Sequence, residues 1–228
     1  MNGPTFPDAK DLVEGTGTRA FAAVTTTAAD WLVVEIMTEQ NTGGETFPPS
    51  GGGLTYTLQN DAGVGGGDCR HLHYTAPDVA GGSRTVTITP NSGTRLYRAR
   101  LTVVRGSDGP GTGKGTSVSA QTVNVTRQRN NSALFMTVGD FAAGAIGTPV
   151  WIPEGLTVAS QQGSGATYLF GRLDDADTAD AALSGISTPS YATPSVAVLE
   201  MLTLVTGPEV DGVRGVIRKV PRARRVRR

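Results

Sequence analysis

Three side chains with the chemistry of zinc ligands lie close together in the sequence. Cys69, His71 and His73 alternate along one short segment, and they are the only Cys and His residues of the chain. In an extended strand, residues two apart share a face, so this spacing could present two or three ligands to one metal ion. The alternative is a polar, solvated face, with Leu72 and Tyr74 packed inward. Because nothing nearby supplies the base and nucleophile of a zinc hydrolase, we expect no bound metal and no catalysis.

A glycine-rich stretch resembles a phosphate-binding loop. Residues 108–116 read DGPGTGKGT. A P-loop needs Gly five positions before the Gly-Lys pair, Ser or Thr directly after the Lys, and then a helix. Here Asp108 and Gly115 occupy those two positions, and the following residues have the pattern of a strand. We therefore interpret residues 106–115 as a loop without regular structure.

Two further groups of residues have chemistry-bearing types without a specific pattern. An acidic loop contains Asp174, Asp175, Asp177 and Asp180. It lacks the ligand order, glycine and distal Glu of an EF-hand, so a solvated turn is the preferred interpretation. Five aromatic residues could form a sugar-stacking platform if they converged, but aromatic residues on strands usually belong to the core. They are Trp31, Tyr56, Tyr74, Trp151 and Tyr168.

The charges of the chain are unevenly distributed. Acidic and basic residues number twenty each, but eight of the basic ones follow Val213 and no acid follows Asp211. The remaining twelve basic residues share residues 1–213 with all twenty acids, which gives that part a net charge of −8. Such a like-charged block usually serves as an interaction arm. The eight residues are Arg214, Arg218, Lys219, Arg222, Arg224, Arg225, Arg227 and Arg228.

We predict that these eight basic residues bind a partner, and three uses of the segment remain open. It could bind an acidic patch on a neighbouring copy of the protein. It could neutralise nucleic-acid phosphates, with an affinity that falls steeply with salt. It could also be a disordered end without a function.

The elements that must position all these groups have the pattern of strands. Short runs rich in Val, Ile, Thr, Tyr and Leu alternate with Gly, Pro, Asn and Asp, which is typical of strands joined by turns. The clearest are residues 30–40, 53–59, 84–89 and 97–105. Others are expected at residues 18–26, 69–75, 117–125, 133–138, 156–160, 167–173 and 195–204. The sequence thus predicts an all-β protein.

Alternation in residues 30–40 assigns side chains to two faces. Leu32, Val34 and Ile36 share one face, whereas Val33, Glu35 and Met37 share the other. Since a charged residue is rarely buried without a partner, we expect the face with Glu35 to meet water or a partner. With 38% hydrophobic residues and one cysteine, the fold must depend on packing without an internal disulfide.

Three segments are predicted along the chain. Residues 1–17 form an extended N-terminal arm, residues 18–206 form one two-sheet β-sandwich of jelly-roll type, and residues 207–228 form the basic C-terminal arm. A single domain is preferred to a division near residues 106–115, because neither half has enough apolar strands to close a core alone. No apolar run approaches the about 18 residues of a membrane span, and the first residues lack the pattern of a secretory signal.

A succession of segments is similar to β-rich virion proteins of tailed phages that infect actinobacteria, such as minor tail proteins. The segments are DWLVVEI (30–36), GGGLTYTL (51–58), CRHLHYTA (69–76), RTVTIT (84–89), LTVVRGSDGPG (101–111) and VAVLEM (196–201). The similarity covers roughly residues 28–205; GDFAAGAIG (139–147) departs from it, and the basic tail lies outside it. The resemblance implies a noncatalytic virion component with a sandwich or jelly-roll body, present in several copies.

From these observations we expect a structural protein of the tail, tail tip or head surface. It would be made in the host cytoplasm, located in the virion, without a cofactor and not associated with a membrane. Its expected partners are other virion proteins and copies of itself, with nucleic acid possible through the basic arm. The alternative is a carbohydrate-binding or host-recognition adhesin module with a glycan partner.

Overall fold

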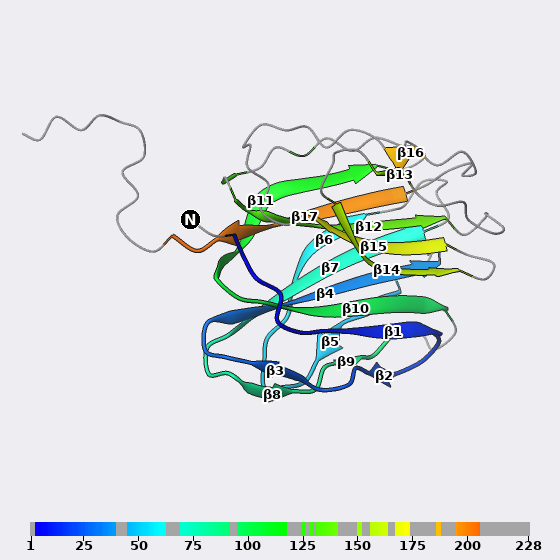
Figure 1. Ribbon diagram of the computed structural model, residues 1–228. Coiled ribbons are helices and arrows are strands. Elements are labelled where there is room, and N and C mark those ends of the chain that lie inside the picture. The colour runs from blue at the N-terminus through cyan, green and yellow to red at the C-terminus, as the bar shows by residue number, and fades with distance from the viewer. Residues whose placement is uncertain are drawn as a thin grey trace, which may run out of the picture.

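Antiparallel strands make up the fold in the computed structural model (Figure 1). The structure describes residues 3–39, 45–62, 69–91, 95–117, 125, 128–129, 131–140, 150–151, 156–163, 167–173, 186–187 and 195–205. Within these ranges every regular element is a strand, so the all-β prediction is confirmed.

The first sheet has five strands and is built from the first half of the chain. Their order is β1-β10-β4-β7-β6, and every pair is antiparallel. The strands are β1 (Ala9–Gly15), β10 (Tyr97–Val104), β4 (Asp30–Glu39), β7 (Cys69–Asp78) and β6 (Thr57–Ala62). The alternation predicted for residues 30–40 is therefore realised in the centre of this sheet.

The second sheet also has five strands, all from residues 107–203. Its order is β11-β17-β12-β15-β14, again antiparallel throughout. The strands are β11 (Ser107–Ser117), β17 (Ser195–Thr203), β12 (Ala133–Asp140), β15 (Thr167–Leu173) and β14 (Leu156–Gly163).

Short strands complete the description. They form a sheet of β2 (Arg19–Ala20), β9 (Thr87–Ile88) and β5 (Pro49–Ser50), and the pairs β3 (Val24–Thr26) with β8 (Gly82–Arg84) and β13 (Val150–Trp151) with β16 (Ile186–Ser187). In Figure 1 the strands β2, β3, β5, β8 and β9 lie at the bottom, below β1 and β10, and the second sheet lies at the top.

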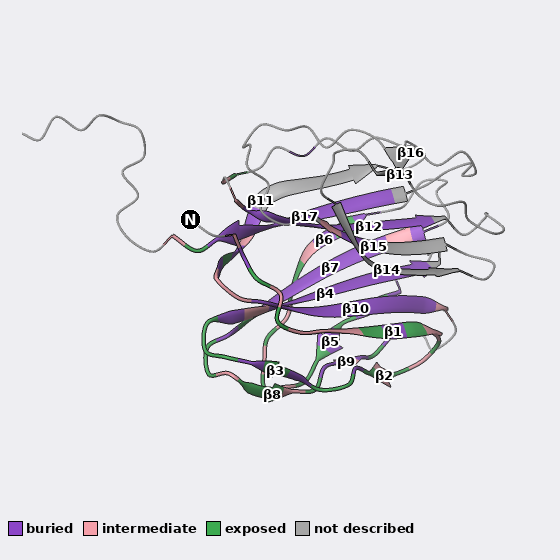
Figure 2. Cartoon of the chain, in the orientation of Figure 1, coloured by how far each residue is buried: buried purple, intermediate pink, exposed green. Residues whose placement is uncertain are grey.

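The first sheet is covered on both faces. On one face, residues such as Leu32, Ile36 and Leu101 pack with Phe47 and Ile88 from the short-strand region. The opposite face meets the second sheet. Strand β10 is buried along its whole length (Figure 2). Burial on both sides explains why β4 and β7 contain so few exposed positions.

The two halves of the chain share a core. One cluster joins Val33 and Val104 of the first sheet to Phe135, Leu199 and Met201 of the second. Side chains of both halves would therefore lose buried contacts if the halves separated.

Several segments differ from their predicted structure. Of the predicted strand at residues 53–59, only residues 57–59 lie in a strand, β6. The predicted strands at residues 18–26 and 84–89 are each divided between short strands, and most of residues 117–125 lies outside the described residues.

Residues 106–115 were expected to form a loop, but β11 runs through them, so that prediction is wrong. A glycine- and proline-rich strand is tolerated because β11 is an edge strand that pairs only with β17, and its register shifts between Ser107 and Gly109 and between Pro110 and Lys114. In the predicted N-terminal arm, residues 9–15 form β1, which pairs with β10 at the edge of the first sheet.

Candidate functional site

The three candidate zinc ligands share one face of β7, and that face is buried. Cys69, His71 and His73 each have 0% of their surface exposed. Both histidines meet the same hydroxyl of the second sheet: Thr137 Oγ1 lies 2.9 Å from His71 Nδ1 and 3.2 Å from His73 Nε2. The shared face was predicted correctly, but its solvation was not, because the second sheet covers it.

Cys69 has apolar neighbours. It packs with Met37 of β4 and Phe170 of β15. A side-chain carbon placed on Gly139 would lie only 2.7 Å from its sulfur, so the thiol fills the space that the glycine leaves. In the part of the chain that the structure describes, no three His, Cys, Asp or Glu side chains are arranged to hold a metal ion.

Glu35 lies beside these histidines in the centre of the first sheet. Its neighbours in register are Arg100 on β10 and His73 on β7. It is 1% exposed, so the expectation that its face meets water or a partner is wrong: the second sheet of the same chain covers it. Burial raises the pKa of Glu35 to about 8, although the positive charges of Arg100 and Arg172 oppose the rise. The carboxyl group is therefore largely protonated at neutral pH.

Ion pairs hold the edge strand β1 to β10 next to Glu35. Arg100 Nη1 donates to both carboxylate oxygens of Asp11, at 2.8 Å and 2.9 Å. Arg98 Nη2 donates to Glu14 Oε2 at 3.1 Å. Arg100 is thus hydrogen-bonded to the partly exposed Asp11, and its charge also acts on the buried Glu35.

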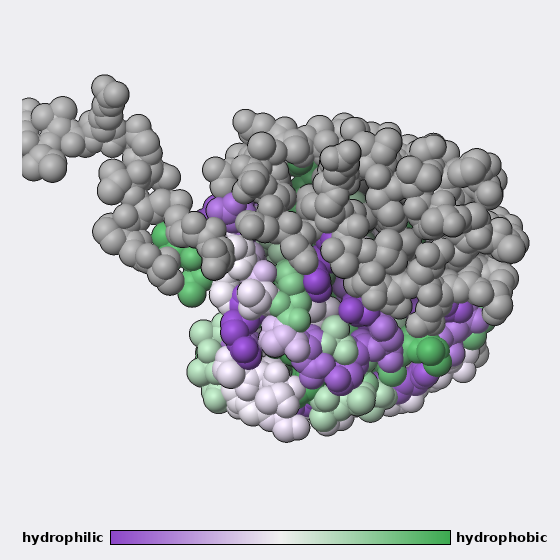
Figure 3. Space-filling view, in the orientation of Figure 1, coloured by the Kyte–Doolittle hydropathy of each residue, from purple (hydrophilic) through white to green (hydrophobic). Residues whose placement is uncertain are grey.

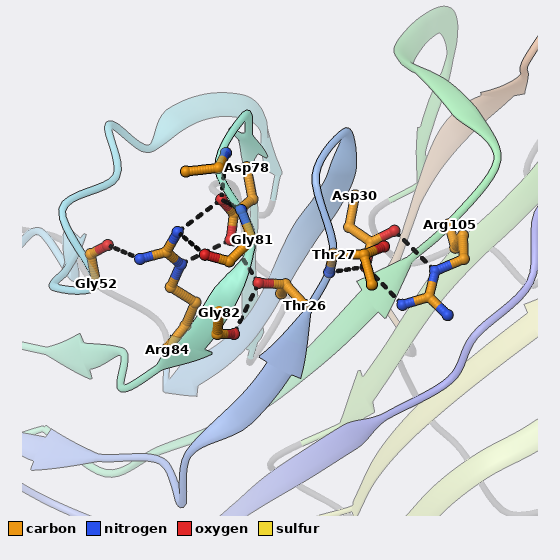
Figure 4. A network of polar contacts seen from close by, with 10 residues as sticks. Thr26, Thr27, Asp30, Gly52, Asp78, Gly81, Gly82, Arg84 and Arg105 are labelled. Atoms are coloured by element: carbon orange, nitrogen blue, oxygen red, sulfur yellow. Dashed lines mark hydrogen bonds and ion pairs between the residues drawn. The ribbon is translucent and has the colours of Figure 1, made fainter.

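A second polar cluster centres on Asp78, at the end of β7 (Figure 4). Its carboxylate accepts two hydrogen bonds from Arg84, at 2.6 Å and 2.8 Å, and one from Thr26 Oγ1 at 2.6 Å. The backbone amides of Ala80 and Gly81 donate as well. The Arg84 hydrogen bonds are the main reason that the pKa of Asp78 lies well below its usual range.

Asp30, at the start of β4, has a similar arrangement (Figure 4). Arg105 donates from Nε at 3.0 Å and from Nη2 at 2.9 Å, and the amide of Thr27 donates at 2.7 Å. Burial raises the pKa of Asp30, but these hydrogen bonds outweigh it and the pKa lies below its ordinary value. Both carboxylates therefore hold the turns around β3, β4 and β7.

Glu200 is the buried carboxylate of the second sheet. Its exposure is 0%, and it accepts hydrogen bonds from the backbone amides of Gln128 and Arg129, at 2.9 Å and 3.2 Å. In the sequence Glu200 lies among apolar residues such as Val198 and Leu202, so alternation alone does not show whether it is buried. Backbone donors satisfy it, and no pattern of side-chain types could have revealed them.

The aromatic residues of the described part lie on different faces. Trp31 packs against the cluster between the sheets, whereas Tyr56 and Tyr74 pack on the opposite face of the first sheet. These three do not converge on one surface. The side chains of Trp151 and Tyr168 lie outside the described residues.

Several predicted features also fall outside the described residues. They are the acidic loop with Asp174, Asp175, Asp177 and Asp180, and the basic segment with Arg214, Arg218, Lys219, Arg222, Arg224, Arg225, Arg227 and Arg228. The stretch that resembles a phosphate-binding loop lies in β11 instead of before a helix, so it lacks the amides that a helix N-terminus would provide.

The chemistry-bearing side chains of the described region are thus engaged in packing and in hydrogen bonds within the chain. No known protein-family model, no curated protein and no solved structure matches this chain. Among the described residues, none forms a helix of the length and apolar character needed to cross a membrane.

Proposed function

We propose that the protein is a noncatalytic structural component of a tailed-phage virion, a minor tail, tail-tip or head-surface protein. In this proposal its body is a two-sheet β-sandwich of jelly-roll type, and copies assemble through loops and terminal arms. The resemblance of residues 28–205 to virion proteins of tailed phages supports it. So does the antiparallel, all-β architecture, which presents loops and strand edges for contacts.

The observation that carries the proposal is the separation of charge along the chain. Eight basic residues follow Val213, after a part with a net charge of −8. Most carboxylates of the described body already have a cationic or amide partner within the chain: Asp8, Asp11, Glu14, Asp30, Glu45, Asp61, Asp78, Asp108 and Glu200. A basic segment of this kind is suited to bind another copy or another acidic partner.

The described surface fits a protein that binds through such segments. Its exposed large hydrophobic residues are Val13 on β1, Leu58 on β6, Val79 directly after β7 and Leu204 directly after β17, so they are far apart in the sequence. On the face shown in Figure 3, hydrophilic and hydrophobic residues are interspersed over the lower part of the molecule. The larger contacts of the assembly are therefore assigned to the basic C-terminal segment.

Locating the protein on particles tests the proposal. We expect quantitative mass spectrometry of purified virions to find several copies per particle, and immunogold labelling to place them on the tail or head surface. Absence from purified particles, or turnover of a small molecule by the pure protein, would contradict it.

The partner of the basic segment is tested separately. We expect a variant with Arg218, Arg222, Arg224, Arg225 and Arg227 changed to Gln to lose self-association in light scattering at 50 mM NaCl. If the partner is duplex DNA instead, its binding constant should fall with salt at a log–log slope of up to about −7 for eight basic residues. A variant that associates as well as the original protein would refute a role of the segment in assembly.

A further inference from the structure

Two buried histidines of the first sheet meet one threonine of the second sheet where the five-stranded sheets pack on each other, a region that we name the seam. The Thr137 hydroxyl lies 2.9 Å from His71 Nδ1 and 3.2 Å from His73 Nε2. It also lies 3.5 Å from the carbonyl oxygen of Ala197 on β17. Since a hydroxyl donates one hydrogen bond and accepts two, Thr137 can accept from both histidines while it donates to Ala197. We name His71, His73 and Thr137 the latch.

Two arginines of β10 lie in the same rows of the first sheet as the histidines. Arg98 shares a row with His71, and Arg100 shares a row with His73, with one residue of β4 between them in each case. Residues of one row share a face of the sheet, so both arginines lie on the face that carries the latch. Both are buried, and their charges are balanced by Glu14 and Asp11 of β1.

Glu35 is the buried carboxyl of β4 on this face. It lies between Arg100 and His73 in register, and the charge of Arg172 on β15 also acts on it. Glu35, His71 and His73 are close enough to take up protons as a coupled set. Whichever of the three holds a given proton, a fall in pH adds positive charge to the seam. That charge costs free energy while the seam is closed, because no bulk water solvates it there.

The first sheet has a second core that does not depend on the seam. The cluster on its opposite face contains only residues between Leu12 and Val103, so every member belongs to the first sheet or to the short-strand region. Separation of the two sheets would leave this cluster packed. The seam can therefore open as a local event, with the first sheet still folded.

We propose that the latch holds the two sheets together at neutral pH and releases them in acid, so that the seam opens while the first sheet stays folded. In the open state water solvates the protonated histidines, whereas in the closed state they remain buried. The open state therefore takes up protons more readily, and opening becomes more favourable as pH falls. The latch acts in this way whether or not the protein belongs to a virion.

The single cysteine of the chain reports the opening. Cys69 lies on the same face of β7 as the histidines, is 0% exposed, and packs against Phe170 of the second sheet. A thiol reagent reaches it only when the second sheet moves away. We expect the reaction of the full-length protein with 4,4′-dithiodipyridine, in the presence of EDTA, to become at least about tenfold faster between pH 7.5 and 5.5, relative to urea-unfolded protein at the same pH. Each proton taken up contributes up to about tenfold per pH unit.

Backbone exchange separates opening of the seam from global unfolding. Residues 97–104 form β10, which lies between β1 and β4 in the first sheet. Their hydrogen–deuterium exchange should stay slow at both pH values, because the first sheet keeps its hydrogen bonds. Loss of this protection together with the exposure of Cys69 would show global unfolding and overturn the proposal.

Two variants assign the response to the histidines. The double variant His71→Asn, His73→Gln keeps a polar group near each ring nitrogen that contacts Thr137, but neither amide takes up a proton. The acid-dependent gain in Cys69 reactivity should be absent from it. Glu35→Gln is the matched control, since it keeps both histidines and should keep the gain. An equal gain in the double variant, no gain in the original protein, or loss of the gain in Glu35→Gln would each contradict the latch.

Nuclear magnetic resonance of the original protein supplies a test that needs no variant. His71 and His73 are the only histidines of the chain, so their imidazole carbon signals can be followed directly. Both should change over the pH range in which Cys69 becomes reactive. Protonation of both histidines while Cys69 stays unreactive would also overturn the proposal.

Discussion

Replacing Glu35 with Gln should stabilise the protein at alkaline pH. The folded-state pKa of Glu35 is about 8, against 4.5 for an ordinary Glu, because burial disfavours the charged form. Folding therefore binds a proton between these values, and the stability that this proton contributes is complete below pH 4.5 and lost as pH rises through 8. At 1.36 kcal/mol per pH unit, the full difference sets an upper limit of about 5 kcal/mol.

We expect the gain of Glu35→Gln at pH 9 to be about 2 to 5 kcal/mol, since relaxation and water entry reduce the limit. Urea unfolding at pH 4.5, 7 and 9 measures it, with a shift of the midpoint at pH 9 of about 1 to 2 M. The two proteins should be equally stable at pH 4.5. Glu14→Gln is the control: it breaks the ion pair of a partly exposed carboxylate with the buried Arg98, so, unlike Glu35→Gln, it should not stabilise the protein at pH 9. A Glu35→Gln effect that is the same at all three pH values would refute the reasoning.

Three more predictions concern the described residues. Asp78→Asn should lower the free energy of unfolding at pH 7, measured with urea, by about 3 kcal/mol, because it leaves the donors around that buried position poorly paired. Asp61→Asn is the control: it changes a partly exposed pair with Arg70 and should lower the free energy of unfolding by less than about 1 kcal/mol. The Asp78→Asn deficit should shrink as pH falls below 3.8, because there the unfolded chain takes up a proton at Asp78 that the folded protein, with its lowered pKa, does not; a constant deficit would contradict this. Gly109→Ala should lower thermal stability more than Gly17→Ala. Both glycines have positive φ, but only at Gly109 would the added side-chain carbon lie against another side chain, 2.5 Å from Trp31. Equal losses of thermal stability in the two variants would contradict this difference in packing. Equimolar zinc should leave the unfolding midpoint unchanged, because Thr137 already engages both histidines; a clear rise would show a metal site.

The sequence predicted the strands because their signal is local. Each segment contains its own alternation of apolar and polar residues with a period of two. The prediction was therefore correct for residues 167–173 and for most of residues 30–40, 97–105 and 195–204. The shared face of Cys69, His71 and His73 follows from the same geometry. β11 was missed because its pattern of glycine and proline is typical of a loop, and pairing with β17 along an edge overrides that local preference.

Only the tertiary structure decided which faces are buried and what the polar residues do there. Glu35 has the sequence pattern of a residue facing water, yet the second sheet, formed by residues more than seventy positions away, covers it and raises its pKa. In the same way Thr137 of the second sheet lies within hydrogen-bond distance of both histidines of the first sheet, and the backbone amides of Gln128 and Arg129 donate to Glu200. Local alternation fixes the side of the strand on which a side chain lies, whereas solvation and hydrogen bonding depend on segments that meet only when the chain folds.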